Sequence, residues 1–192
     1  MPPRYDVPKA APKPLRLVQE LVNTTDHEHG RELLPSPEAL VAWLAERGLS
    51  SEDATATDLE RTRALREALR SLLVANAGEG LDDGVVERLN EIAAAAEVGL
   101  AFAEDGSARL ASRAEGVAAA HGELLAIVHG AMVDGTWPRL KACRHCTWAF
   151  YDYSKNRSAT WCSMKICGNR LKTRAYRARH PRGGSARTSH SG

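Results

Sequence analysis

The stretch CRHCTWAFYDYSKNRSATWCSMKICGNR, from Cys143 to Arg170, holds all four cysteines of this 192-residue chain. Cys143 and Cys146 have the spacing C-x2-C, Cys162 and Cys167 have the spacing C-x4-C, and fifteen residues separate the two pairs. A C-x2-C turn lets two thiolates point at one ion, and a second pair near the start of a helix can complete a tetrahedron. The pattern therefore predicts one structural zinc ion bound by all four cysteines.

Two other uses of these cysteines are weighed against zinc. The start of the chain, MPPRYDVPKAAPKP, has no apolar signal region, so we expect a cytoplasmic, reducing location in which disulfides are disfavoured. Iron is disfavoured because closed four-thiolate sites of this size usually hold zinc. His145, which lies inside the first pair, is an alternative ligand or a phosphate contact.

The residues around the cysteines predict a small domain that depends on metal and on aromatic packing. Residues 137–176 contain seven of the ten aromatic residues of the chain. About 40 residues bury too little area to fold alone, and a bound metal compensates for this. We expect TWAFYDY to form a strand, SKNRS a turn, TWC a returning strand, and SMKICGNRLKTRAYRAR a helix capped by Ser163. This order is that of a treble-clef-like ββα zinc finger.

The rest of the chain has mainly helical periodicity. Apolar residues at helical spacing, with Ser, Pro and Gly at the expected ends, predict helices within 15–26, 36–49, 51–80, 82–97 and 114–137. The segment 99–112 instead alternates around EDGS, which predicts a β-hairpin. The expected fold class is mainly α (α+β): a flexible lead over 1–14, a helical domain over 15–138, the finger over 139–180 and a disordered tail over 181–192. We find no run of about 18 apolar residues, so no membrane span is expected.

The net charge changes sign at the same boundary, between residues 138 and 139. Residues 1–138 hold 13 Lys and Arg against 23 Asp and Glu, a net of −10, whereas residues 139–192 hold 13 basic residues against one acid, Asp152, a net of +12. Such asymmetry indicates two modules with different partners. The basic end favours a polyanion, which the acidic part would repel.

The last predicted helix has cationic stripes on both sides of a polar face. Such a helix can lie against a duplex, with its flanks on phosphates and its middle near base edges. The candidate nucleic-acid contacts are Lys155, Arg157, Lys165, Arg170, Lys172, Arg174, Arg177 and Arg179. The alternative is that these charges only solvate an exposed helix, although a solvated face normally mixes both signs. Arg170 has a second alternative, a structural role in which it hydrogen-bonds a backbone carbonyl or pairs with Asp152. Gly168 indicates close packing or an unusual backbone angle.

CGNR at Cys167–Arg170, preceded by FYDYSKNRSATWCSMKI, closely resembles the bacterial CGNR zinc-finger family. LVNT at Leu21–Thr24 and SPEALVAWLAERGL resemble the ABATE domain that precedes that finger. The resemblance implies a stress-related transcription regulator whose finger binds DNA. It places the metal ligands at Cys143, Cys146, Cys162 and Cys167, and the name motif is completed by Gly168, Asn169 and Arg170.

Other functions remain open from the residues alone. The finger could bind RNA or the ribosome, or dock on an acidic surface, including the chain's own helical domain. The helical domain could sense a small-molecule effector or form a homodimer; Asn23 and Thr24 are interpreted as helix caps rather than pocket residues. No catalytic motif is recognised, and we expect no enzyme activity. His27 and His29 could bind a metal or act in acid–base chemistry, but a solvated loop is favoured.

Overall fold

The computed structural model describes residues 9–49 and 51–168, without the side chains of Lys165 and Ile166. The helices of this part are α1 (Arg16–Val22), α2 (Pro37–Ala45), α3 (Ala56–Asn76), α4 (Val85–Ala95) and α5 (Gly116–Val133). The predicted mainly α fold with small hairpins is confirmed, and each predicted helical segment of the N-terminal part contains one of these helices.

Local sequence signals set where two helices begin. Ser36 caps α2 by accepting a hydrogen bond from the Ala39 N–H, and Pro37 occupies the first turn as predicted. Thr55 and Asp58 form a reciprocal capping box at the start of α3. These bonds satisfy amide groups that the first turn of a helix leaves without partners.

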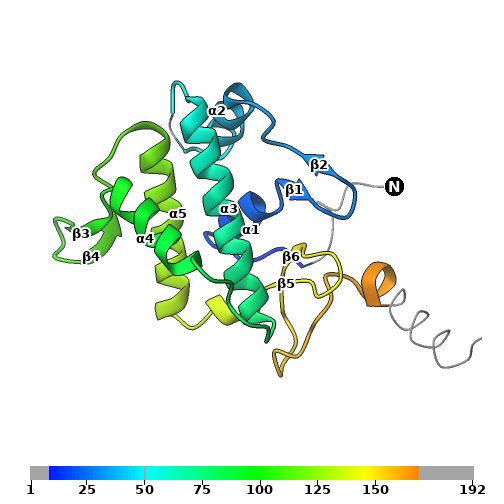
Figure 1. Ribbon diagram of the computed structural model, residues 1–192. Helices are drawn as coiled ribbons and strands as arrows, with labels where there is room; N and C mark the ends of the chain where they lie inside the picture. The colour runs from blue at the N-terminus through cyan, green and yellow to red at the C-terminus, as the bar shows by residue number, and fades with distance from the viewer. Residues whose placement is uncertain (1–8, 50, 169–192) are drawn as a thin grey trace, which may run out of the picture.

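The long helix α3 is the centre of the molecule. It contacts α1, α2, α4 and α5, which surround it in Figure 1, and its Leu65, Leu69 and Leu73 side chains are fully buried. The three leucines are four residues apart, so they share one face of the helix and form one side of the main core. The end of α3 reaches the C-terminal hairpin, which places the cysteine segment beside the helical part.

The strands of the described chain form three antiparallel hairpins. These are β1 (Thr25–Asp26) with β2 (Arg31–Glu32), β3 (Gly99–Phe102) with β4 (Ala108–Ala111), and β5 (Leu140–Ala142) with β6 (Ala149–Tyr151). The β3–β4 hairpin confirms the prediction for residues 99–112. The β1–β2 hairpin was not predicted, because two-residue strands show no alternation in the sequence.

The pairing of the finger strands differs from the sequence prediction. Residues 149–151 form the expected strand, but its partner is β5, which precedes the first cysteine pair, and the prediction that TWC returns beside it was wrong. The Cys143–Cys146 knuckle itself makes the turn, and the Cys143 N–H extends the ladder by donating to the Trp148 carbonyl at 2.9 Å. Loop residues after β6 are instead organised by the Asp152 carboxylate, which accepts the N–H groups of Ser154 and Ala159.

The β5–β6 hairpin is buried on both faces. Leu140, Ala142, Ala149 and Tyr151 belong to the main core with the helices, whereas Phe150 packs with the cysteines in a second core. Side chains alternate between the faces of a strand, so one short hairpin can serve both cores. The hydrophobic core therefore runs across residue 138, where the domain boundary was predicted.

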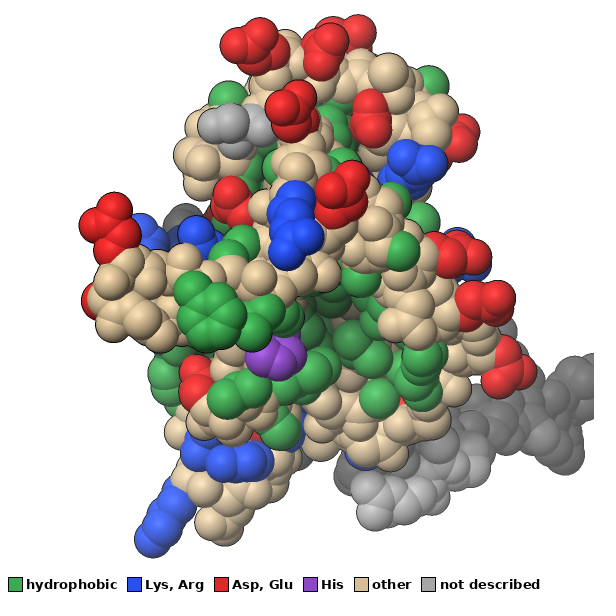
Figure 2. All heavy atoms as spheres, turned by 90° about the vertical axis from the view of Figure 1, so that its left-hand side faces the viewer, with side chains coloured by type: hydrophobic (Ala, Val, Ile, Leu, Met, Phe, Trp, Pro, Cys, Tyr) green, Lys and Arg blue, Asp and Glu red, His purple; other side chains and the backbone are tan. Residues whose placement is uncertain are grey.

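Helix α5 has the length and composition that could span a membrane, with a mean hydropathy of 1.4 over its 18 residues. In the structure 39% of that window is buried, and α5 packs against α1, α3 and α4 through Val117, Leu124 and Val128. The same composition is typical of a core helix in a globular fold. Apolar side chains from α5 and the β3–β4 hairpin remain exposed on the face shown in Figure 2.

Helix α5 also carries a buried titratable group. The His121 ring lies 2.8 Å from the Thr62 hydroxyl, and burial lowers the pKa of His121 to about 4, with Asp58 opposing and Arg61 reinforcing the shift. The folded protein therefore holds this ring neutral, whereas the unfolded chain protonates it near pH 6.5. Stability from this group is present above pH 6.5 and is lost as the pH falls toward 4.

We predict that His121 weakens the fold in mild acid. The free energy of unfolding should fall by about 1 kcal/mol between pH 7.5 and 5.5, and by about 3 kcal/mol in total by pH 4 from this group. Urea unfolding with zinc in excess measures the first interval, and NMR of the imidazole reports its charge. The control is His129→Gln on the exposed side of α5, which should keep the same slope. A protonated His121 at pH 5.5 in the folded protein would contradict the prediction.

Candidate metal centre

Two short segments bring the four cysteines to one point. Cys143 and Cys146 bracket the turn between β5 and β6, while Cys162 and Cys167 flank the start of the helical segment η3 (Met164–Gly168). All four sulfur atoms lie within 4.8 Å of one another, and all four residues are buried. The predicted ligand residues are therefore together, and His145 is not one of this group.

The spacing of the sulfurs fits a tetrahedral ion. The Cys146–Cys162 sulfurs are 3.7 Å apart, and the sulfur of Cys167 lies 3.6 Å from each of them. A tetrahedral zinc with bonds of about 2.3 Å to thiolates requires sulfurs about 3.8 Å apart. Four thiolates with this separation complete the coordination shell, so the donor set fits a structural zinc and leaves no position for a reacting water.

The electrostatics of the cluster also require a cation. Hydrogen bonds from Cys146 and the other thiols lower the pKa of Cys143, whereas contacts with Cys143 and Cys146, together with burial, raise the pKa values of Cys162 and Cys167. Four clustered sulfurs cannot all carry a negative charge unless a cation neutralises part of it. When bound, zinc supplies that charge and holds the two chain segments together.

Aromatic rings enclose the sulfurs. Trp148 and Phe150 share the buried cluster with the four cysteines, and Trp161 packs against its edge. Gly168 follows the last cysteine, and a Cβ atom at this position would lie 2.6 Å from the Met164 sulfur and 3.4 Å from the Trp161 ring. The prediction of close packing at Gly168 is confirmed, and its backbone is not in the left-handed region.

Asp152, the one acid of the basic segment, is completely buried. Its carboxylate accepts a 2.9 Å hydrogen bond from the Lys141 ammonium as well as the two loop N–H groups. Burial alone would raise its pKa, but hydrogen bonds from Ser154 and Lys141 outweigh burial and hold the pKa of Asp152 at about 2. Lys141 is thus an ion-pair partner of Asp152; the alternative partner Arg170 lies outside the described residues.

The amide side chains of Gln19, in α1, and Asn23, the C-cap residue of α1, connect the finger to the helical part through hydrogen bonds. Asn23 donates to the Ala149 carbonyl at 3.0 Å and accepts from the Ala149 N–H at 2.8 Å, and Gln19 donates to the same carbonyl. The Thr24 hydroxyl donates to the Leu21 carbonyl. Asn23 is the C-cap residue of α1, as interpreted, and its backbone N–H donates to the Gln19 carbonyl, while its side chain is used for strand β6. Sequence reasoning missed this role because Asn23 and Ala149 are 126 residues apart.

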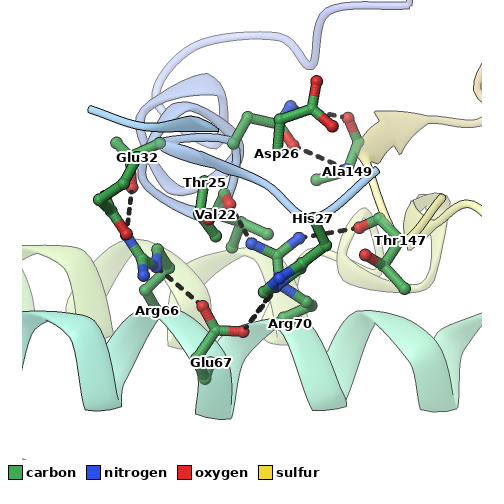
Figure 3. Close-up of polar contacts among 12 residues, drawn as sticks. Val22, Thr25, Asp26, His27, Glu32, Arg66, Glu67, Arg70, Thr147 and Ala149 are labelled. Carbon is green, nitrogen blue, oxygen red and sulfur yellow. Dashed lines mark hydrogen bonds and ion pairs between the residues drawn. The ribbon is translucent and has the colours of Figure 1, made fainter. Parts of the chain in front are cut away.

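A second connection comes from α3 and is drawn in Figure 3. Arg70 is buried and donates to the carbonyls of Val22 and Thr147, so its guanidinium joins the end of α1 to the metal knuckle. Burial lowers the pKa of Arg70, while Glu67, which it contacts at 2.9 Å, and the nearby Cys146 oppose that shift. Arg66 binds Glu67 and Glu32 on the same face.

Hydrogen bonds to the Asp26 carboxylate hold together the loop that contains His27 and His29. The buried Asp26 carboxylate accepts the N–H groups of Glu28 and His29, the His29 ring at 2.9 Å and Arg31 at 3.1 Å. Among the described residues, only the four cysteines bring three or more metal-ligating side chains together. His145 lies 3.9 Å from the Glu28 carboxylate, which connects this loop to the knuckle.

The predicted nucleic-acid contacts are only partly described. Lys155 and Arg157 are exposed in the turn that follows β6, as a phosphate contact requires. The remaining candidates lie outside the described residues: the Lys165 side chain, Arg170, Lys172, Arg174, Arg177 and Arg179, together with Asn169 of the name motif.

Comparison with known families agrees with this geometry. The ABATE family model, described as "Putative stress-induced transcription regulator", matches residues 15–134. The chain belongs to the ABATE family. A CGNR zinc-finger model matches residues 139–180, which include the four cysteines, so zinc is the cofactor of this ABATE protein. No curated protein matches the chain.

We predict that each of the four cysteines is needed for metal binding. Purified protein should contain one zinc per chain, and Cys162→Ser should lose that zinc because three thiolates leave the tetrahedron open. Elemental analysis and a chelator-release assay measure this. Ser163→Ala and His145→Ala are the matched controls and should retain zinc. Loss of zinc in His145→Ala with Cys162→Ser still loaded would contradict the ligand set.

A separate prediction concerns the bridge from Asn23 to β6. Asn23→Ala should lower the free energy of unfolding by about 1–3 kcal/mol, because it leaves the buried N–H of Ala149 without its partner and its carbonyl with Gln19 alone. Denaturant unfolding of the zinc-loaded protein measures the change. Asn90→Ala on the exposed face of α4 is the control and should cost nothing, since alanine favours helices. Equal effects at the two sites would show that the bridge contributes little.

Proposed function

We propose that this ABATE protein is a cytoplasmic DNA-binding transcription regulator whose zinc-stapled finger contacts the nucleic acid. The observation that carries the proposal is the burial of Asp152. Because this residue is the one acid between 139 and 192, and because Lys141 neutralises it inside the fold, the finger presents no acidic side chain to solvent. A surface that carries cations and no carboxylates attracts a polyanion.

Zinc changes the charge of this segment only slightly. A zinc ion with four thiolates has a formal charge of −2, which reduces the net charge of residues 139–192 from +12 to +10. The remaining excess is large enough to bind phosphates along a duplex, and such binding weakens as salt increases. The metal then acts as a clamp: it fixes the knuckle and the start of the following segment in one orientation.

Few ion pairs join the described part of the finger, residues 139–168, to the helical part. The described contacts are mainly apolar packing of β5–β6 and hydrogen bonds to backbone groups. The charged exceptions within 9–49 and 51–168 are long: Arg144 lies 3.9 Å from Glu79, and His145 lies 3.9 Å from Glu28. For the described residues of the finger, this argues against docking on the chain's own acidic surface and favours an external polyanion.

The helical domain would serve the finger by sensing a small-molecule effector or by forming a homodimer. A groove of about 990 Å³ runs along α5, the β3–β4 hairpin and Pro12–Leu15, with Leu100 and Val133 exposed at its sides. Apolar surface of this kind is the natural place for the expected homodimer. The proposal assigns no catalytic step to the protein and no contact with a membrane.

We predict that the turn after β6 contributes to DNA affinity through phosphates. The double variant Lys155→Gln, Arg157→Gln should bind duplex DNA more weakly, and the slope of log K against log salt should decrease by about 1.8, or about 0.9 per lost phosphate contact. Fluorescence anisotropy across a salt series measures the slope. The control has the same change of charge on the helical part, Arg88→Gln with Arg109→Gln, and should keep the wild-type slope.

The same titration separates DNA from the alternatives. The wild-type protein should prefer duplex DNA to structured RNA of equal length at equal salt. Binding to RNA alone would replace this proposal with an RNA-binding or ribosome-associated function. Binding to neither, together with capture of an acidic protein, would favour the protein-interaction alternative.

A further inference from the structure

A small cavity lies at the junction of the helical part and the finger. Its volume is about 270 Å³, and helices α1 and α2, strand β6 and the segment before α1 form its walls. The residues that line it are Lys9, Ala10, Arg16, Gln19, Glu20, Asn23, Leu33, Trp43, Arg47, Trp148, Ala149 and Phe150. The volume is slightly below the range of about 300–1,000 Å³ that is usual for ligand sites, so the cavity suits a molecule of one or two rings.

The cavity carries an excess of positive charge. Lys9, Arg16 and Arg47 line it, against a single carboxylate, Glu20. That carboxylate is shared, because Arg16 contacts it at 2.9 Å and Arg47 at 3.0 Å. Arg47 also contacts Glu46, which lies outside the lining, at 3.1 Å. The charged residues at the cavity therefore have a net charge of +1, which favours an anionic group inside it.

The other walls are aromatic. The Arg47 guanidinium lies 4.2 Å from the centre of the Trp43 ring, and the Lys9 ammonium lies 4.7 Å from that of Phe150. Such cation–π pairs hold the charges close to flat apolar surfaces. A molecule that combines an aromatic ring with a carboxylate would match both features of the lining.

We propose that this cavity binds a small aromatic acid of one or two rings, with the carboxylate at Arg16 and Arg47 and the ring against Trp43 and Trp148. The inference deepens the proposed function, on which it rests, by placing the effector site of the helical domain at the finger. Neither family match assigns a ligand to this place.

The position of the cavity would connect a bound acid to the metal centre. Phe150 and Trp148 form one of its walls and pack against the cysteines, and Gln19 and Asn23 form another wall and hold Ala149. A ligand that contacts both walls binds only when the finger is docked on α1. Binding to the docked state shifts the population toward that state and slows its opening.

Isothermal titration calorimetry of the zinc-loaded full chain with three matched probes tests the proposal. We expect 1-naphthoate to bind at least ten-fold more tightly than neutral 1-naphthamide, and cationic 1-naphthylmethylamine not to bind. Equal affinities for the acid and the amide would overturn the assignment of an acid. No binding of 1-naphthoate up to millimolar concentration would overturn the site.

Matched variants test whether the probe binds in this cavity. Arg16→Gln should reduce the affinity for 1-naphthoate several-fold, and Arg47→Gln by about ten-fold, while their affinity for 1-naphthamide should change little. Arg16 is half-exposed, so this variant tests the site even if Arg47→Gln fails to fold. Arg88→Gln on α4 makes the same change of charge away from the cavity and should bind as the wild type does. Wild-type affinity in both cavity variants would contradict the proposal.

A second readout tests the connection to the finger without any nucleic acid. Saturating 1-naphthoate should slow the release of zinc to a chelator by several-fold in the wild type and not in Arg16→Gln at the same concentration. An unchanged rate in the wild type with the probe bound would overturn the coupling. Because neither assay contains DNA, failure of DNA binding and failure of this site are separate results.

Discussion

The β5–β6 hairpin has to be buried on both faces, and the rest of the structure depends on this requirement. One face supplies Leu140, Ala149 and Tyr151 to the helical core, and the other supplies Phe150 to the cluster around the sulfurs. A strand pair of three residues each is too short to be stable alone. It persists because the helices cover one face and the metal centre covers the other. Loss of either support exposes the apolar face that it covered.

Buried polar groups fix how the two parts meet. Asn23 satisfies both backbone groups of Ala149, and Arg70 joins carbonyls from α1 and from the knuckle. Hydrogen bonds of this kind are directional, whereas apolar packing alone tolerates sliding. The metal centre is therefore oriented relative to the helices.

Charge is distributed unevenly between the finger and the helical part. Asp152 is paired with Lys141 inside the fold, so the finger organises its loop with a carboxylate and yet shows none to solvent. Many acids of the helical part lie on its surface, as seen on the face in Figure 2. A polyanion would therefore be attracted to one end of the molecule and repelled from the other.

Much of the local structure could be predicted from the residues. Ser36 and Pro37 marked the start of α2, EDGS marked the β3–β4 turn, and the spacing of the cysteines identified one zinc site. These features depend on neighbours in the chain, where backbone preferences and ligand spacing act directly. The partner of β6 was predicted wrongly, because the sequence shows which segments can be strands but not which of two candidates will pair.

The sequence by itself determined the helices, the ligand set and the division of charge. Only the tertiary structure decided that the Asn23 side chain holds β6, that Lys141 pairs with the buried Asp152, and that a cationic aromatic cavity forms between α1, α2 and the finger. The physical reason is the same in each case. These contacts join groups whose meeting requires the whole chain to be folded, and no periodicity or spacing along the sequence records which distant backbone group will be left without a partner.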